Sequence, residues 1–252
     1  MQKRNTQQRR RTIIERLNKF GEVAVDVLAK DLQTSEVTIR KDLAELENSG
    51  LLLRKYGGAV PLPSESSELS SEKLSLRKQA IGKLAATLIH DHNRIIIDGG
   101  STTSALLPCL SQKLGLVVMT NSLHVANSLL EIENEPQVLM TGGTWDAQSH
   151  SFQGQMAQNT LQAYNFDQAF VGAAGLDIER GTTTFNELIS LTRTMAEVSK
   201  SLVVMAEAEK LERKIPNIEL PWEVISVLVT DKSLPDEARA RIEGHGVKVL
   251  CA

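Results

Sequence analysis

The 252-residue sequence predicts an α/β protein with a small, mainly helical N-terminal domain and a larger domain built on a mainly parallel sheet. After residue 90, short apolar runs alternate with helical patterns, which is typical of parallel strands covered by helices on both faces. Before residue 61 the apolar residues follow a helical period instead. A stretch rich in proline, serine and acid, Pro61–Glu68, separates the two patterns and is interpreted as a linker. We therefore expect domains at residues 1–62 and 69–252.

The N-terminal domain should begin with a helix at about Thr6–Lys19, followed by a connector or short strand at Gly21–Val25. A second apolar turn then ends at a break, Gln33-Thr34. Ser35 is a suitable N-cap for the next helix, because its hydroxyl can accept from free amides of the first turn. That helix carries one buried stripe, formed by Ile39, Leu43 and Leu46, and should end near Gly50.

A helix that follows a short turn in this way is the second helix of a helix-turn-helix, whose N-terminal residues face the base edges of DNA. The next segment, Leu51–Val60, is expected to form a strand, a tight glycine turn and a second strand, which is a wing. Nine residues of these elements are candidates for DNA contact: Ser35, Glu36, Thr38, Arg40, Lys41, Arg54, Lys55, Arg9 and Arg10. Of these, Arg9, Arg10, Arg54 and Lys55 are assigned to the phosphate backbone.

The distribution of charge agrees with this interpretation. The chain has a net charge of −3, yet residues 1–60 hold 12 lysines and arginines against 8 acids, so the remainder carries −7. A basic domain attached to an acidic one places the phosphate-binding surface in one part of the molecule. Operator double-stranded DNA is therefore the expected macromolecular partner.

The larger domain should contain seven buried strands and at least six helices. A first helical pattern covers Leu69–His90. The strands are expected at Ile95–Asp98, Leu116–Thr120, Gln137–Thr141, Gln168–Gly172, Leu202–Met205, Val224–Thr230 and Val247–Cys251. The other helices are expected at Thr103–Leu110, Leu123–Leu130, Met156–Tyr164, Asn186–Lys200 and Asp236–Gly244.

Polar, glycine-rich loops follow several of these strands, and ligands of open parallel sheets bind beyond the carboxyl ends of the strands. After the first strand, two glycines let the backbone approach a ligand, and hydroxyl residues then open a helix whose amides favour a phosphate. Similar loops follow the next two strands. The candidate ligand residues are Asp98, Gly99, Gly100, Ser101, Thr102, Thr103, Thr120, Asn121, Gly142, Gly143, Glu187 and Lys210.

The motifs of both domains resemble those of the DeoR family of bacterial transcriptional regulators. Thr34–Leu43, Leu46–Gly50 and Arg54–Ala59 are similar to the family pattern of the DNA-binding domain, and Asp98–Thr103, Thr120-Asn121, Thr141–Gly143 and Thr183–Glu187 to that of the effector domain. Within the family, the chain most resembles repressors of glucitol and N-acetylgalactosamine operons. One stretch departs: Glu207–Leu211 stands where the family has D-S-S-K-F, and only Lys210 is kept.

The resemblance implies an effector domain related to ribose-5-phosphate isomerase and a repressor of a carbohydrate catabolic operon that a phosphorylated sugar releases. In that case Ser101–Thr103 lie near the phosphate, Asp98 and Glu187 bind sugar hydroxyls, and Lys210 pairs with a negative group. A homo-oligomer, dimer or tetramer, is expected because helix-turn-helix proteins usually bind paired half-sites. The sequence suggests no cofactor.

An alternative is a sugar-phosphate aldose–ketose isomerase with an appended DNA-binding domain. Asp98, Glu187 and Lys210 would then supply a general base and stabilise an enediolate. A sensor that consumed its own effector would erase its signal, so we expect a non-enzyme without catalytic residues. No metal site is expected either, because His90 and His92 lie in a polar helix end without further ligands.

Two features bear on the compartment. No apolar run approaches the length of about 18 residues that indicates a membrane span, so no membrane partner is expected. The polar N-terminus does not resemble a secretory signal, and Cys109 and Cys251 are interpreted as reduced thiols. We expect a cytoplasmic protein.

Overall fold

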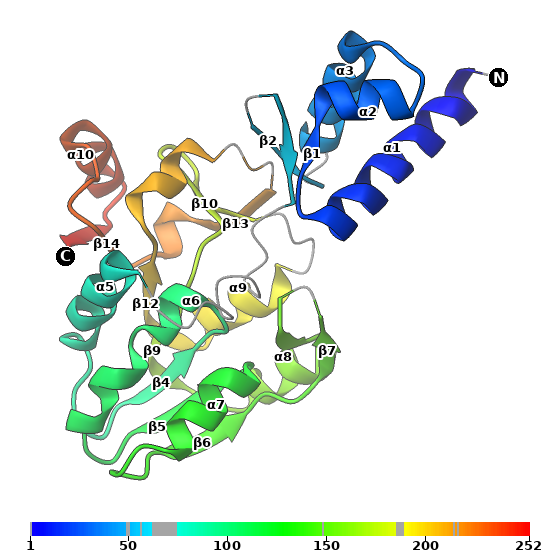
Figure 1. Ribbon diagram of the computed structural model, residues 1–252. Coiled ribbons are helices and arrows are strands. Elements are labelled where there is room, and N and C mark those ends of the chain that lie inside the picture. Colours follow the sequence, from blue (N-terminus) through cyan, green and yellow to red (C-terminus); the bar gives the residue numbers. More distant parts are fainter. Residues whose placement is uncertain are drawn as a thin grey trace. The chain divides into compact units, whose positions relative to one another are not determined.

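A computed structural model describes residues 2–48, 51–55, 57–61, 75–147, 149–184, 189–213, 215 and 217–252. The chain divides into two compact units, Met1–Ser64, here called the head, and Glu65–Ala252, here called the body (Figure 1).

The head contains a helix-turn-helix and a wing, as predicted. Its described residues form α1 (Gln2–Phe20), β1 (Val23–Ala24), α2 (Val25–Asp31), α3 (Glu36–Asn48), β2 (Leu53–Lys55) and β3 (Gly58–Val60). The three strands make an antiparallel sheet in the order β1-β3-β2, so the connector before α2 pairs with the wing. The three helices share one buried core, which contains Leu17 of α1, Leu28 of α2, and the stripe of Ile39, Leu43 and Leu46 on α3. Ser35 caps α3, because its Oγ accepts a hydrogen bond from the Thr38 amide at 3.2 Å.

A buried carboxylate joins the first helix of the head to the third. Asp42 on α3 is only 2% exposed. Its two oxygens accept hydrogen bonds from the Nε atoms of Arg9 and Arg10 on α1, the latter at 2.9 Å. Because these residues are more than 30 positions apart in the chain, the cluster fixes how α1 lies against α3.

The body is built on a parallel sheet whose described strands number seven, in the order β15-β14-β12-β9-β4-β5-β6. All neighbouring pairs run parallel. The strands are β4 (Arg94–Ile97), β5 (Val117–Thr120), β6 (Gln137–Met140), β9 (Phe166–Val171), β12 (Ser199–Met205), β14 (Val227–Thr230) and β15 (Lys248–Cys251). Each overlaps one of the seven strands that the sequence predicts.

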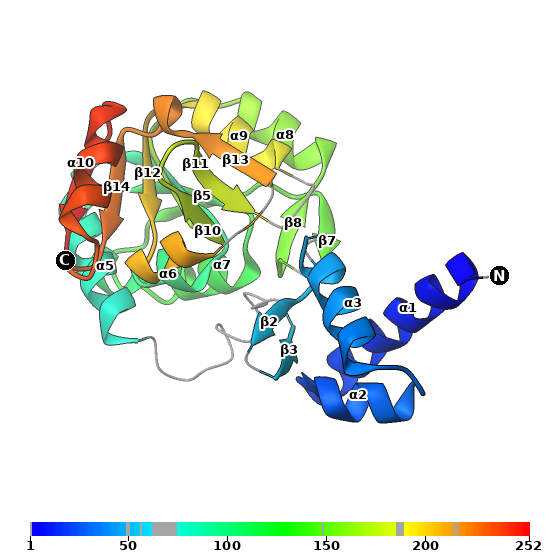
Figure 2. The same ribbon diagram turned by 90° about the horizontal axis from the view of Figure 1, so that it is seen from above.

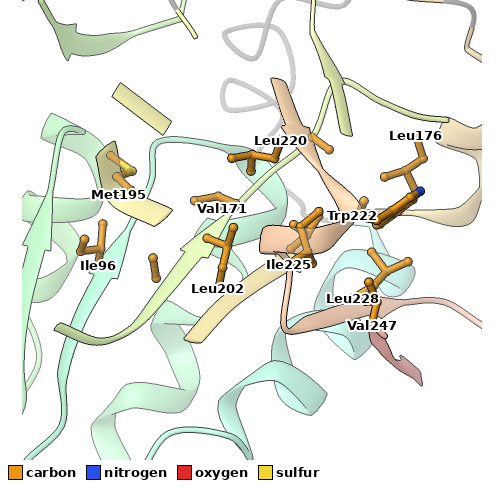
Figure 3. Close-up of a cluster of buried hydrophobic side chains, with 14 of the residues drawn as sticks. Ile96, Val171, Leu176, Met195, Leu202, Leu220, Trp222, Ile225, Leu228 and Val247 are labelled. Carbon is orange, nitrogen blue, oxygen red and sulfur yellow. The ribbon is translucent and has the colours of Figure 1, made fainter. Parts of the chain in front are cut away.

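Helices cover both faces of this sheet. Alternate side chains of one strand enter different cores: Ile95 and Ile97 pack with α5 (Leu76–Ala86) and α7 (Leu123–Leu130), whereas Ile96 faces α8 (Gln155–Gln162) and α9 (Ser190–Glu197). Figure 2 shows α8 and α9 on one side of the sheet and α5 and α7 on the other. The core that contains Ile96 also includes side chains of α10 (Asp236–Gly244). Trp222, which is fully buried, belongs to the same core (Figure 3).

Two smaller sheets complete the described part of the body. A hairpin joins β7 (Thr144–Asp146) to β8 (Ser151–Gln153), and an antiparallel sheet has the order β10-β11-β13, with β10 at Gly175–Asp177, β11 at Gly181–Thr184 and β13 at Asn217–Pro221. The helix predicted at Thr103–Leu110 is wrong in form. The structure has a four-residue helix, α6 (Ser101–Ser104), and then a 3₁₀ segment, η1 (Leu107–Gln112), because Pro108 has no amide to continue an α-helix. Two further 3₁₀ segments are η2 (Ala208–Glu212) and η3 (Trp222–Val224).

Candidate functional site

The exposed side of α3 carries most of the predicted DNA-contact residues of the helix. Glu36 and Arg40 form an exposed ion pair, with Arg40 Nη2 2.7 Å from Glu36 Oε2. The Thr38 hydroxyl lies 2.8 Å from that of Ser35, whose Oγ also caps the helix. Lys41 is exposed on the side opposite to the buried stripe. The face therefore presents hydroxyl, carboxylate and cationic groups together, which are suitable partners for base edges.

The two predicted cations of the wing lie on β2, and both are paired with acids of the head. Arg54 Nε is 3.6 Å from Glu47 Oε2, and the Arg54 amide donates to Glu47 Oε1 at 3.0 Å. Lys55 forms an ion pair with Glu22, which lowers the pKa of that carboxyl. Both cations remain exposed, so phosphate oxygens can reach them.

Arg9 and Arg10 have a partner that the sequence does not reveal. Their side chains are 16% and 29% exposed, and both donate to the buried Asp42. Their first role is therefore to hold α1 on α3. A phosphate contact by the outer nitrogens of these guanidinium groups stays a prediction.

In the body, the order of the strands reverses between β4 and β9. After β4, the chain adds β5 and β6 on one side of it. The later strands, β9, β12, β14 and β15, are then added in turn on the other side of β4. The loops that leave β4 and β9 therefore diverge at the carboxyl edge, where open α/β sheets bind ligands. Asp98, the residue after β4, donates its amide to the Phe170 carbonyl of β9 at 3.0 Å, so it lies at this reversal.

An asparagine after β5 holds the loop after β4. Asn121 is fully buried, and its Nδ2 donates to Asp98 Oδ1 at 2.8 Å. Its Oδ1 accepts from the Gly99 amide at 3.0 Å. The structure thus brings three predicted ligand residues into one network, and it orients the Asp98 carboxylate.

The hydroxyl residues of α6 are buried, at 3–4% exposure for Ser101 and Thr102 and none for Thr103. Thr103 Oγ1 donates to the carbonyls of Asp98 and Gly100, at 2.8 and 2.9 Å, so it stabilises the loop. Ser101 Oγ instead accepts from Lys78 Nζ at 2.8 Å. Lys78 comes from α5 and is itself 8% exposed, which makes it a buried cation beside the glycine loop.

Four more of the predicted ligand residues, Thr120, Gly142, Gly143 and Lys210, lie at the same edge of the sheet. Thr120 ends β5 and its Oγ1 accepts from the Ser122 amide at 3.1 Å. Gly142 and Gly143 follow β6 and have positive φ values, +62° and +114°, that favour glycine. Lys210, also 8% exposed, donates to the carbonyl of Ala173 in the loop after β9. Glu187 lies outside the described residues.

Sequence reasoning missed two charged residues near this edge, Lys78 and Glu219. Lys78 belongs to a helix identified by its apolar residues alone, and nothing in that pattern shows which loop the helix faces. Glu219 lies on β13 and accepts a hydrogen bond from Thr182 Oγ1 at 3.4 Å. Burial, and after it the nearby Asp98 charge, raise the pKa of Glu219 to about 7, although hydrogen bonds from Thr192 and Thr182 act in the opposite direction. Burial likewise raises the pKa of Asp98 to about 6.

These two acids should make the stability of the body depend on pH. Because both pKa values are raised on folding, their protonated forms stabilise the folded state fully below about pH 4, and this contribution is lost as pH rises through 6 to 7. Between pH 5 and pH 8 the free energy of unfolding of the wild type should fall as Glu219 ionises. The variant Glu219→Gln stays neutral, so its free energy of unfolding should fall by roughly 1–3 kcal/mol less over the same range. Urea unfolding at the two pH values measures this difference.

The matched control is Glu223→Gln, which changes an exposed acid of η3 four residues later. This variant should keep the pH dependence of the wild type. An unchanged pH dependence in Glu219→Gln would show that Glu219 is ionised in the folded state throughout this range.

Both the head and the body match models of known protein families. The model described as "DeoR-like helix-turn-helix domain" matches residues 9–65, and the model described as "DeoR C terminal sensor domain" matches residues 74–232. The second match alone covers more than half of the chain and includes the Asp98 loop, Asn121 and Lys210.

Three relatives align along nearly their whole length. A candidate transcriptional repressor of the aga operon from Escherichia coli O157:H7 is 36% identical, over 97% of this chain and 93% of the relative. The HTH-type transcriptional regulator GlpR of Haloferax volcanii is 32% identical, over 96% of each chain. The HTH-type transcriptional repressor GlcR of Bacillus subtilis is 29% identical, over 94% of this chain and 93% of the relative.

Among solved structures, ribose 5-phosphate isomerase A of Methanocaldococcus jannaschii is similar over 55% of this chain and 57% of that chain, with a TM-score of 0.41 and 17% identity. Among the described residues, no helix is long and apolar enough to cross a membrane.

Proposed function

This chain belongs to the DeoR family of transcriptional regulators, and from this premise we propose that it represses a carbohydrate catabolic operon and is released by a phosphorylated sugar, sugar alcohol or amino sugar. The head, residues 1–62 in this proposal, binds the operator. Residues 69–252 sense the effector and form a homodimer or homotetramer. As a repressor of this kind, the protein acts in the cytoplasm.

One observation supports the effector site most strongly. Two buried lysines, Lys78 and Lys210, lie at the same sheet edge as the Asp98–Asn121 pair, where the strand order reverses. Ammonium groups that are kept from water interact strongly with a phosphate, and a carboxylate beside an amide suits the hydroxyls of a sugar. The site thus has separate groups for the two ends of a sugar phosphate.

In this proposal Lys78 and Ser101 lie at the phosphate, with Thr102 and Thr103 shaping the loop around it. Asp98, Asn121 and Glu187 bind hydroxyls of the sugar, and Lys210 pairs with a further negative group. Gly99, Gly100, Gly142 and Gly143 let the backbone come close to the ligand, and Thr120 closes the end of β5.

The DNA-binding role is supported by the exposed face of α3 and by the basic wing. Ser35, Glu36, Thr38, Arg40 and Lys41 meet base edges or the adjacent backbone in this proposal, and Arg54 and Lys55 meet phosphates. An effector can release the operator only if it binds the DNA-free arrangement of the oligomer more tightly than the DNA-bound one.

The isomerase alternative is not favoured. The relatives that align over more than nine-tenths of this chain are named as transcriptional regulators. Saturable binding of sugar phosphates without turnover is the expected behaviour of a sensor, and conversion of ribose 5-phosphate to its ketose would contradict it.

The proposal is tested with the full chain in two steps. Duplexes are first selected from a random pool, and the enriched sequence is used in gel shifts. A panel of phosphorylated sugars, sugar alcohols and amino sugars is then screened for a rise in melting temperature, because a ligand that binds only the folded state stabilises it. The stabilising compound should release the selected duplex. Enrichment of no sequence would contradict DNA recognition, and release by no phosphorylated compound would contradict the sensor.

Lys78→Gln should separate effector binding from DNA binding. The variant keeps a hydrogen-bonding group beside Ser101 but loses the charge, and charge-assisted hydrogen bonds contribute about 1.5–3 kcal/mol. We expect normal binding of the selected duplex, and release at effector concentrations about 10 to 100 times higher than in the wild type. Gel shifts titrated with the effector measure this change.

Lys83→Gln is the matched control, because Lys83 lies on the same helix and is exposed. It should respond to the effector like the wild type. A normal response in a folded Lys78→Gln protein would place the phosphate elsewhere.

A further inference from the structure

The most exposed large apolar side chain of the described part of the head is Val37, at 73%, followed by Phe20 at 64%. Val37 is the second residue of α3. On a helix of 3.6 residues per turn, it points roughly 200° away from Ile39, the first residue of the buried stripe. Lys41, one turn later, shares the face of Val37. Val37 thus projects directly outward, at the end of α3 that meets base edges in helix-turn-helix proteins.

The stability of the head does not explain a valine at this position. A β-branched residue has a lower helix propensity than alanine, and at this exposure it buries little apolar surface. The polar residues on either side of Val37 have local partners: Glu36 bonds Arg40, and Thr38 bonds Ser35. The apolar side chain of Val37 therefore lies between two polar pairs and next to the cation of Lys41.

This combination matches one feature of the major groove. Among base edges there, the C5-methyl group of thymine is the apolar group, and side-chain methyls contact it. The basic residues Lys41, Arg54 and Lys55 complement the phosphates on either side of such a contact. We propose that Val37 is a specificity-determining residue of the head that contacts the methyl group of a thymine in each operator half-site. The proposal rests on the proposed DNA-binding function.

The test removes the methyl group from either partner. The full-length protein first selects a duplex from a random pool. Each thymine that is invariant among the selected sequences is then replaced in turn by deoxyuridine, which lacks only the C5-methyl group. For the wild type, a replacement in one half-site should weaken binding about four-fold, the factor for burying one methyl-sized group, and a replacement in both half-sites about 16-fold. Val37→Ala should bind the thymine duplex more weakly by a similar factor, and the same replacement should then cause no further loss.

Val27→Ala is the matched control, because Val27 is a 51% exposed valine of the same unit that lies on α2. It should keep the deoxyuridine sensitivity of the wild type. The inference is overturned if no thymine of the selected duplex is sensitive in the wild type, or if Val37→Ala shows the same sensitivity. If the wild type enriches no duplex at all, the proposed function fails instead, so the two failures are distinguishable.

Discussion

Asp42→Ala should accelerate amide exchange throughout the helices of the head by about 100-fold. Asp42 is nearly inaccessible to water and accepts hydrogen bonds from both Arg9 and Arg10. Breaking a buried ion pair by removing one partner costs about 3–5 kcal/mol. Because both arginines keep partial exposure, we expect the lower end of this range, about 3 kcal/mol, which changes the ratio of folded to unfolded head about 100-fold.

This loss is large for so small a unit, whose total stability should be roughly 3–9 kcal/mol. Hydrogen exchange of peptides from residues 2–48 of the full chain measures the change, and DNA binding should fail at a lower temperature than in the wild type. Glu15→Ala is the control. It removes an ion pair with Arg11 at 3.0 Å on the same α1, but both side chains are exposed, so it should cost less than about 0.5 kcal/mol. Equal exchange rates in the two variants would mean that Asp42 does not fix α1.

Gly82→Ala should lower the melting temperature of the body by about 6–12 °C. Gly82 lies where α5 crosses the end of α6, and a Cβ at this position would be 2.3 Å from the Ala105 carbonyl oxygen and 2.5 Å from its carbon. Since these are backbone atoms, α5 must move away. Overpacking of this kind costs about 3 kcal/mol, and each kcal/mol lowers the melting temperature of a unit of this size by about 2–4 °C.

The same displacement should also weaken the response to the effector, because α5 carries Lys78 and its hydrogen bond to Ser101. Gly244→Ala provides the contrast. Gly244 is the last residue of α10, and a Cβ there meets nothing within 4 Å. Alanine at this position should leave the melting temperature unchanged or raise it slightly, because alanine is the better helix former. Similar melting temperatures for the two variants would contradict the close approach of α5 to α6.

The elements that could be predicted from the sequence are those with a strong local pattern. The strands of the parallel sheet are buried on both faces, so runs such as Ile95–Ile97 and Leu202–Met205 stand out as continuous apolar stretches. The small sheet of β10, β11 and β13 was missed because strands such as Gly175–Asp177 are too short to show a period. The predicted helix at Thr103–Leu110 was wrong because the apolar residues around Pro108 suggested a longer α-helix than the proline permits.

The candidate site could be predicted only in part, for a related reason. Residues next to a strand end, such as Asp98 and Asn121, are located once the strand is located. Lys78 reaches the Asp98 loop from a helix 20 residues earlier, and Glu219 from a strand far later in the chain. Their participation depends on packing between distant segments, which no local pattern encodes. For the same reason the link between Asp42 and the arginines of α1 was not foreseen.

The internal ion pairs of the head have a consequence for the salt dependence of DNA binding. Many of the cations in the described part of the head already have carboxylate partners, among them Arg9 and Arg10 with Asp42, Arg16 with Asp31, Arg40 with Glu36, Arg54 with Glu47, and Lys55 with Glu22. A phosphate must compete with these carboxylates for each cation. Fewer counterions are then released from DNA than the number of lysines and arginines suggests. The logarithm of the binding constant should therefore fall with the logarithm of salt concentration less steeply than about 0.9 per cation of the head.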